Sequence, residues 1–306
     1  MSFTVVPLHN MNLSLDSPIA FGAGFMLTSV PAWLREDEFM VNRLSARERA
    51  FILAAKHALV AEYEASAIGE PDPTETRSSV SIQDSKSEAA MLGNLALWLI
   101  RPTTVCFTTV FHALTKSISG IRHEPPIILR TETRQPLLVH PSDLLNTIST
   151  AEAVQAGALH ATLTSIPRGT TVWSAARSFW GALTVGSEDV RFSLFWIGLE
   201  ALLGPEGNTG EVAYKLAQRI AFLTSKDSEQ AKATFRNAKE CYSTRSKIVH
   251  GRWTSGKNML AHTANTETIG RNVLLRILTD PALLREFLCN KRDTYLEEMV
   301  FSGFSK

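Results

Sequence analysis

The sequence predicts a mainly α-helical protein in which a mixed α+β domain is followed by an antiparallel helical bundle. Strand-like runs of β-branched and aromatic residues occur in the first half of the chain. From about residue 142 the apolar residues recur at helical spacing, and short turns containing Gly, Pro or Asp separate the helical segments. Short connections make consecutive helices antiparallel neighbours. We therefore expect two domains, residues 1–165 with an unassigned role and residues 166–306.

Composition is that of an ordinary globular protein, but the charge is unevenly distributed. The chain has 306 residues, 44% apolar and 20% charged, with a net charge of +1. Residues 1–100 carry 7 Lys and Arg against 12 Asp and Glu, a balance of −5. Residues 211–260 carry 10 against 4, a balance of +6. The basic segment is suited to a polyanion, although two solvated faces of opposite sign would give the same pattern.

Cysteine usage and the N-terminus predict a cytoplasmic protein. Cys106, Cys241 and Cys289 show no C-x-x-C spacing, which favours a reducing compartment and disfavours a cysteine zinc site. The first residues lack the features of a signal peptide. No apolar run approaches the roughly 20 residues that cross a bilayer. We expect no membrane segment, no metal and no other cofactor.

The first half predicts few elements and no catalytic motif. Residues 42–66 have apolar residues at helical spacing, and residues 70–87, rich in Pro and Ser, predict an exposed loop. A second helix is expected at about 86–100. Alternating residue types predict a strand over 103–111, and two short strands are expected at 127–129 and 137–139.

The second half predicts a succession of helices. They are expected near residues 142–165, 170–186, 188–204, 210–224, 227–250, 265–279 and 281–300. Asp227 or Ser228 can cap the helix 227–250 at its start, and Gly251 suits the left-handed position just after its end.

Helix 227–250 carries an arginine on its apolar stripe. Phe235, Ala238, Tyr242, Arg245 and Val249 follow one another at spacings of three and four residues, which places them on one face. Burying an unpaired guanidinium costs several kcal/mol, so Arg245 needs a partner or an interface.

A histidine lies five residues after this arginine. His250 is therefore about 140° around an ideal helix from Arg245. One chain cannot easily present both groups to one small target. Two copies related by a two-fold axis could, because such an interface brings each arginine near the other chain's histidine.

Three sequence blocks carry a resemblance to a known family. Residues 242–251 (YSTRSKIVHG) resemble the R-x4-6-H motif of the HEPN superfamily, most closely its Apea-like branch. The resemblance extends to residues 195–204 (FWIGLEALLG) and 215–223 (KLAQRIAFL), and covers about residues 170–300. It implies a compact helical bundle that dimerises around the motif. Many members are metal-independent endoribonucleases, often toxins or effectors of antiviral defence.

The resemblance also implies roles for individual residues. Arg245 and His250 would be the active pair, and Ser246 would fill a polar position that is often Asn, Asp or His in catalytic members. The matching blocks add Tyr242, Glu200 and Arg219 as supporting residues. RNA would be the substrate and a second copy the partner, and a cognate inhibitor or an activating ligand is a further expected partner.

Such a site needs no metal because RNA carries its own nucleophile, the 2′-hydroxyl. Histidine can serve as base or acid, and arginine offers a fork of donors to the phosphate. Lys247, Arg252 and Lys257 would hold phosphates along the strand, and Trp253 could stack on a base.

Structural roles remain open for the same residues. Arg245 could form an internal ion pair with Glu200, which also lies in an apolar helix, and His250 could cap its helix. Glu200 and Arg219 could together form a buried pair. The domain would then be a non-catalytic module for dimerisation or nucleic-acid binding. In a third reading, the acidic front region masks the basic one.

Overall fold

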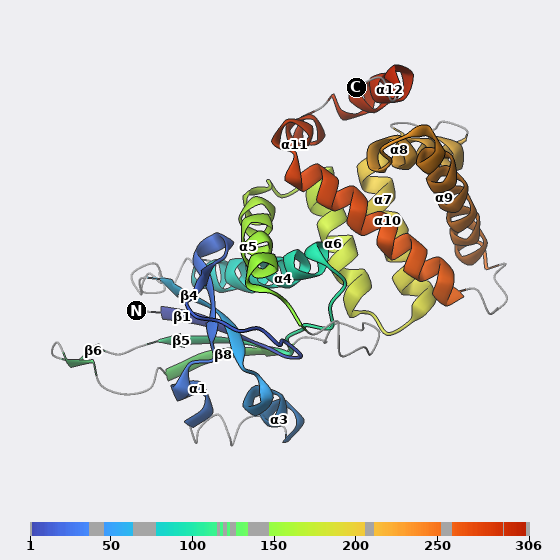
Figure 1. The fold of residues 1–306 in the computed structure, drawn as a ribbon. Helices are drawn as coiled ribbons and strands as arrows, with labels where there is room; N and C mark the ends of the chain where they lie inside the picture. The colour runs from blue at the N-terminus through green and yellow to red at the C-terminus, as the bar shows by residue number, and fades with distance from the viewer. Residues whose placement is uncertain are drawn as a thin grey trace. The chain divides into compact units, whose positions relative to one another are not determined.

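The protein divides into two compact units, Met1–Thr164 and Ser165–Lys306 (Figure 1). The computed structural model describes residues 2–36, 46–63, 78–114, 117–118, 121–122, 127–133, 147–205, 211–251, 259–289 and 291–303. The fold is mainly helical with a small antiparallel sheet, which confirms the predicted class at that level. Within the described ranges, no helix combines the length and the apolar character that a bilayer requires.

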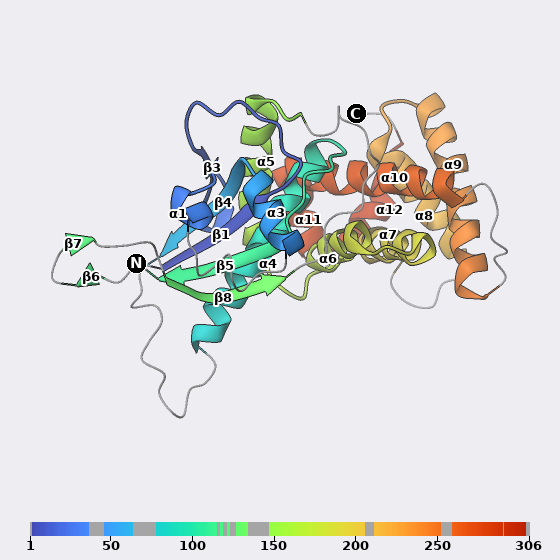
Figure 2. The same cartoon turned by 90° about the horizontal axis from the view of Figure 1, so that it is seen from below.

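The first unit is built on a six-stranded sheet in the order β2-β3-β4-β1-β5-β8. Its strands are β1 (Ser2–Leu8), β2 (Ile19–Ala20), β3 (Phe25–Ser29), β4 (His57–Tyr63), β5 (Thr109–Leu114) and β8 (Ile127–Thr133). β1 is central and pairs antiparallel with both β4 and β5, and Figure 2 shows β4, β1, β5 and β8 side by side. A separate hairpin contains β6 (Ser117–Ile118) and β7 (Ile121–Arg122).

Helices cover both faces of this sheet. On one face, α1 (Ala32–Glu36) and α3 (Ala46–Ala54) pack on Val5, Ala58 and Phe111. On the other face lie α4 (Ser78–Ile100) and α5 (Thr150–Ser165) (Figure 1). There the buried imidazole of His112 lies within hydrogen-bond distance of Thr4 Oγ1 (3.0 Å) and of Ser87 Oγ in α4 (3.2 Å).

Several predictions for the first unit are wrong. The expected helix 42–66 is instead α3 followed by strand β4, which lies between β3 and β1. A central strand covered on both faces lacks the alternation of apolar and polar residues, so its apolar run resembles a helix.

Other boundaries in this unit also shift. The strand expected over 103–111 begins at Thr109, because an Asn94 side-chain bond to Val105 O (2.9 Å) helps hold the preceding segment in an irregular path. Part of the expected Ser-rich loop belongs to α4. The expected strand at 137–139 lies outside the described residues.

The second unit is helical. It contains α6 (Thr171–Thr184), α7 (Glu188–Leu203), α8 (Val212–Thr224), α9 (Ser228–Val249), α10 (Met259–Thr279), α11 (Pro281–Leu288) and α12 (Arg292–Ser302). α7 is the core helix, packed against α6, α8, α9 and α10, with Phe192, Phe195, Trp196 and Leu199 fully buried. The structure has two helices, α11 and α12, where the sequence predicted one helix over 281–300, because the backbone is extended at Cys289.

A glycine brings α7 close to α6. A Cβ at Gly198 would lie 2.3 Å from Cε1 of Phe179, whose ring also packs against Phe195 at 5.7 Å between centroids. At Gly181 in α6, by contrast, a Cβ would meet only Leu194, at an ordinary contact distance of 3.7 Å.

These two glycines are predicted to respond oppositely to alanine. Gly198→Ala should lower the free energy of unfolding by about 1–3 kcal/mol, because the new methyl group overpacks the α6–α7 contact. Gly181→Ala should raise it by up to about 1 kcal/mol, because alanine favours the helix and fits the space. Urea unfolding followed by circular dichroism measures both. Equal changes in the two variants would contradict the assigned packing.

A buried histidine makes the first unit sensitive to acid. The Nε2 of His160 lies 2.7 Å from Ala89 O and must donate to it, so the neutral ring carries its proton there. The ring lies near Phe21 and Phe25. Burial, opposed by this hydrogen bond and reinforced by Lys86, lowers the pKa of His160 to about 4.

Stability should therefore fall between pH 6.5 and about 4. The unfolded state takes up a proton near pH 6.5 and the folded state resists it, so up to about 3 kcal/mol is lost as the pH drops through this window. His160→Gln, which keeps a donor for Ala89, should remove this part of the slope. The measurement is urea unfolding from pH 7.5 to 4, with the exposed His250→Gln as control. An unchanged slope in His160→Gln would refute the assignment.

Candidate functional site

Helix α9 begins and ends where the sequence predicts. The Asp227 side chain caps its start by accepting a hydrogen bond from Gln230 N (2.8 Å). At its other end His250 is the C-cap residue, and its N–H donates to Ser246 O (3.2 Å). Gly251 follows with φ of +63°, the left-handed conformation that suits glycine. These two ends hold the predicted site residues on the last turns of a well-defined helix.

Arg245 forms an ion pair with Glu200 of α7. Its Nη2 donates to Glu200 Oε2 at 3.0 Å, and its Nε lies 3.0 Å from Oε1. The side chains are 22% and 27% exposed, so the pair lies at the edge of the bundle and solvent reaches it. Among the described residues, no hydrogen-bond partner lies at Nη1. The internal ion pair that the sequence left open is therefore formed, and one end of the guanidinium still faces outward.

Aromatic rings hold this pair from the side. The guanidinium lies 5.8 Å from the centroid of the Tyr242 ring, and Tyr242 packs edge-on against the buried Trp196 at 5.1 Å. Burial raises the pKa of the Glu200 carboxyl, against the opposing effects of Arg245 and of a hydrogen bond from Tyr242. Burial and the Glu200 charge raise the pKa of Tyr242, which stays a neutral phenol.

His250 lies on a different side of α9. Its position is about 140° around the helix from Arg245, and it is exposed. Ser246 is half-buried beside Arg245. A single chain therefore places the two predicted catalytic side chains on different faces of α9.

Arg219 does not pair with Glu200, so that expectation is wrong. Its guanidinium contacts Asp293 at 2.7 Å and donates to Leu203 O at 2.9 Å. Arg292 likewise donates to Ala201 O and Gly204 O. These two arginines satisfy carbonyls at the C-terminal end of α7, where cations are favoured. Arg219 is thus part of the bundle's internal structure.

The apolar stripe of α9 is shorter than expected. Val249 is 54% exposed, so the stripe does not continue past Arg245. The buried residues of α9 are Ala231, Ala238, Cys241 and Thr244. The predicted RNA-binding residues Arg252, Lys257 and Trp253 lie outside the described residues.

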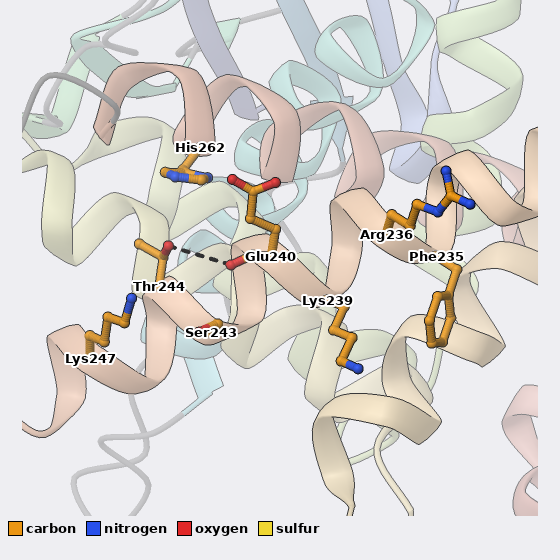
Figure 3. A pocket seen from close by; sticks show the side chains of 8 residues that line it. All are labelled: Phe235, Arg236, Lys239, Glu240, Ser243, Thr244, Lys247 and His262. Carbon is orange, nitrogen blue, oxygen red and sulfur yellow. Dashed lines mark hydrogen bonds between the residues drawn. The ribbon is translucent and has the colours of Figure 1, made fainter.

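Sequence reasoning missed a groove on the outer side of α9. The groove has a volume of about 610 Å³ and is bordered by α9 and by His262 of α10 (Figure 3). Its lining residues are Phe235, Arg236, Lys239, Glu240, Ser243, Thr244, Lys247 and His262. Among them only Lys247 was predicted. The polar residues 236, 240, 243, 247 and 250 recur at spacings of four and three, and this pattern could have revealed the face.

A cysteine and a histidine meet beneath this groove. Cys241 Sγ lies 3.6 Å from His262 Nδ1, which resembles a nucleophile and its base. Cys241 is fully buried, and burial raises the pKa of its thiol to about 11. A thiol that stays protonated and out of reach is no nucleophile. Cys241 therefore serves packing.

Comparisons of the chain with protein-family models, with curated proteins and with solved structures found no match. Within the described residues, no three or more His, Cys, Asp or Glu side chains converge as metal ligands would.

The Arg245–Glu200 pair should show measurable coupling. In a double-mutant cycle of Glu200→Gln and Arg245→Gln, the coupling free energy should be about 1 kcal/mol, because one hydrogen bond and a second close charge contact join a pair that is partly shielded from water. The matched control is the more exposed pair between Arg276 of α10 and Asp280, the N-cap of α11, with about 0.3–0.5 kcal/mol expected. Urea unfolding of the variants gives both values. A coupling near zero for Arg245–Glu200 would show that the contact does not hold the helices.

Proposed function

We propose that the protein is a metal-independent endoribonuclease of the HEPN type that acts as a homodimer. Arg245 and His250 are its catalytic pair. The observation that carries the proposal is the position of Arg245, which Glu200 and Tyr242 hold in place while one end of its guanidinium faces solvent. The exposed His250 lies just over one helical turn further along the same helix.

The chemistry requires a base, an acid and a cation. A histidine accepts the proton of the 2′-hydroxyl, whose oxygen attacks the adjacent phosphorus and forms a 2′,3′-cyclic phosphate. The bond from phosphorus to the 5′-oxygen breaks, and the imidazolium formed in the first step returns its proton to that oxygen. The outward Nη1 of Arg245 donates to the phosphate oxygens as their charge develops.

A second chain supplies what one chain lacks. Arg245 and His250 lie on different sides of α9, so the composite site pairs Arg245 of one chain with His250 of the other across a two-fold axis. Glu200 and Tyr242 then act as positioning residues, because they contact Arg245 and not the reacting atoms.

A non-catalytic dimerisation or nucleic-acid-binding module is the second candidate, and the Glu200 contact favours it. A carboxylate 3.0 Å from the guanidinium opposes its charge and disfavours an approaching phosphate. In this case Arg245 and His250 hold an interface, and their substitution changes oligomeric state or melting temperature with no activity to lose.

The wider role that we propose is a cytoplasmic toxin or antiviral-defence effector. The first unit, whose first 100 residues carry a formal balance of −5, would sense a ligand or mask the basic segment. Deleting residues 1–165 should then raise RNA affinity, whereas an unchanged affinity would contradict masking of the basic segment by the first unit.

The catalytic proposal predicts RNA cleavage in the presence of EDTA. The purified full chain should cleave labelled RNA and leave a 2′,3′-cyclic phosphate end, and both Arg245→Ala and His250→Ala should lose at least about 100-fold in rate. Arg245→Lys should stay impaired because lysine has no bidentate fork. Denaturing gel electrophoresis and mass spectrometry of the products measure this.

Arg276→Ala is the matched control, since it also removes a paired arginine from the second unit. It should retain wild-type rate. Two results together would favour the non-catalytic module. The wild type would be inactive both alone and with candidate activating ligands, and Arg245→Ala would shift the oligomeric state measured by light scattering.

A further inference from the structure

The groove between α9 and α10 carries positive charge that is not neutralised by a carboxylate of the described residues, although Lys239 Nζ lies 5.9 Å from the centroid of the Phe235 ring. We call it the α9–α10 groove; its cations are Arg236, Lys239 and Lys247, and all three are exposed. Among the described residues, no carboxylate lies within ion-pair distance of any of them. Other arginines of this unit are engaged by partners: Arg191 by Glu267, Arg219 by Asp293 and Arg276 by Asp280.

The positions between these cations are polar. Ser243 and Thr244 lie between Lys239 and Lys247, and Thr244 donates to Glu240 O at 3.4 Å (Figure 3). The Glu240 carboxylate points toward His262 and away from Lys247 (Figure 3). Three cations against one carboxylate leave the groove with a net positive charge. Ammonium, guanidinium and hydroxyl groups in one hollow are the donors that phosphates bind.

The groove is long and lies in line with His250. From Arg236 to Lys247 the helix rises about 16 Å, which is more than a single phosphate needs. His250 follows Lys247 by three residues, so it continues the same exposed face by one turn. Arg245 points to the opposite side, toward α7. The cations of the groove therefore share a face with His250.

We propose that the α9–α10 groove binds the phosphate backbone of single-stranded RNA and leads the strand to His250. The role of His250 rests on the function proposed above, whereas the binding role of the groove does not. Contacts of this kind read no sequence, so binding is salt-dependent and tolerant of base identity. Arg236, Lys239 and Lys247 are the binding residues, and the exposed Ser243 lies between Lys239 and Lys247 in the lining.

Other polyanions fit this surface less well. A membrane surface requires apolar side chains beside the basic ones, but Phe235, the one aromatic among the described residues that line the groove, packs edge-on against Tyr214 at 5.2 Å. An acidic peptide would place carboxylates next to Glu240. A phosphate backbone instead matches a row of spaced cations with hydroxyls between them.

Fluorescence anisotropy of the full chain with labelled 2′-O-methyl oligouridine tests the groove. This probe lacks the 2′-hydroxyl nucleophile, so binding is measured whether or not the protein cleaves RNA. The triple variant Arg236→Gln, Lys239→Gln, Lys247→Gln should bind at least about ten-fold more weakly, and the slope of log Kd against log salt should fall by about 2. Ser243→Glu, which adds a carboxylate to the groove lining, should also weaken binding.

Matched variants separate the groove from net charge. A control triple variant removes three exposed cations elsewhere in the same unit: Lys226→Gln, Arg285→Gln, Lys291→Gln. A second control, Ala282→Glu, adds one carboxylate at the start of α11. Both controls should bind as the wild type does. Circular dichroism confirms that every variant is folded.

Three outcomes would overturn the proposal. They are no binding by the wild type, equal loss in groove and control variants, or displacement of the probe by polyglutamate or anionic vesicles as readily as by unlabelled RNA. If the groove binds the probe normally but the protein does not cleave RNA in EDTA, the proposed catalysis is contradicted and the proposed RNA-binding role of the groove is still supported.

Discussion

The ion pair between Arg245 and Glu200, together with the burial of Ala238 and Cys241, fixes which face of α9 lies against the bundle. Because the guanidinium must reach the carboxylate on α7, the face that carries Arg245 and Tyr242 lies against the bundle. The opposite face is then exposed along its length, and it carries the cations of the α9–α10 groove and His250. The helix thus has an inner edge that positions the Arg245 guanidinium and an outer face that is suited to a polyanion. Replacing Arg245 therefore changes a helix contact as well as a candidate catalytic group.

Charge inside the second unit follows a consistent rule. Arg191 and Arg219 are buried and each contacts a carboxylate, and Arg292 donates to carbonyls at the end of α7. Burial without such partners would cost several kcal/mol per ion. Arg245 follows the rule only partly, since Glu200 engages one side of its guanidinium and solvent reaches the other. An arginine held on one side and open on the other is suited to bind an anion, and this distinguishes it from its structural neighbours.

Local features of the site were predictable from sequence, and features that depend on distant segments were not. The Asp227 cap and the left-handed Gly251 depend on a few neighbouring residues, so α9 was placed within one residue at each end. Glu200 could be predicted as the ion-pair partner of Arg245, because each of these charged residues interrupts an apolar stretch of its helix. The Asp293 partner of Arg219 comes from a helix more than 70 positions later, and nothing local marks it. Strand β4 was missed because both of its faces are covered, and the groove was missed because α10 supplies His262.

The central claim is that Arg245 of one chain acts with His250 of another. Co-expression of Arg245→Ala and His250→Ala chains, followed by purification of the mixed dimers through two different tags, tests it directly. Each mixed dimer holds one site with both wild-type side chains, so cleavage of RNA in EDTA should return to about half of the wild-type rate, although each parent variant is inactive. Mixed dimers as inactive as the parents would contradict a site shared between chains.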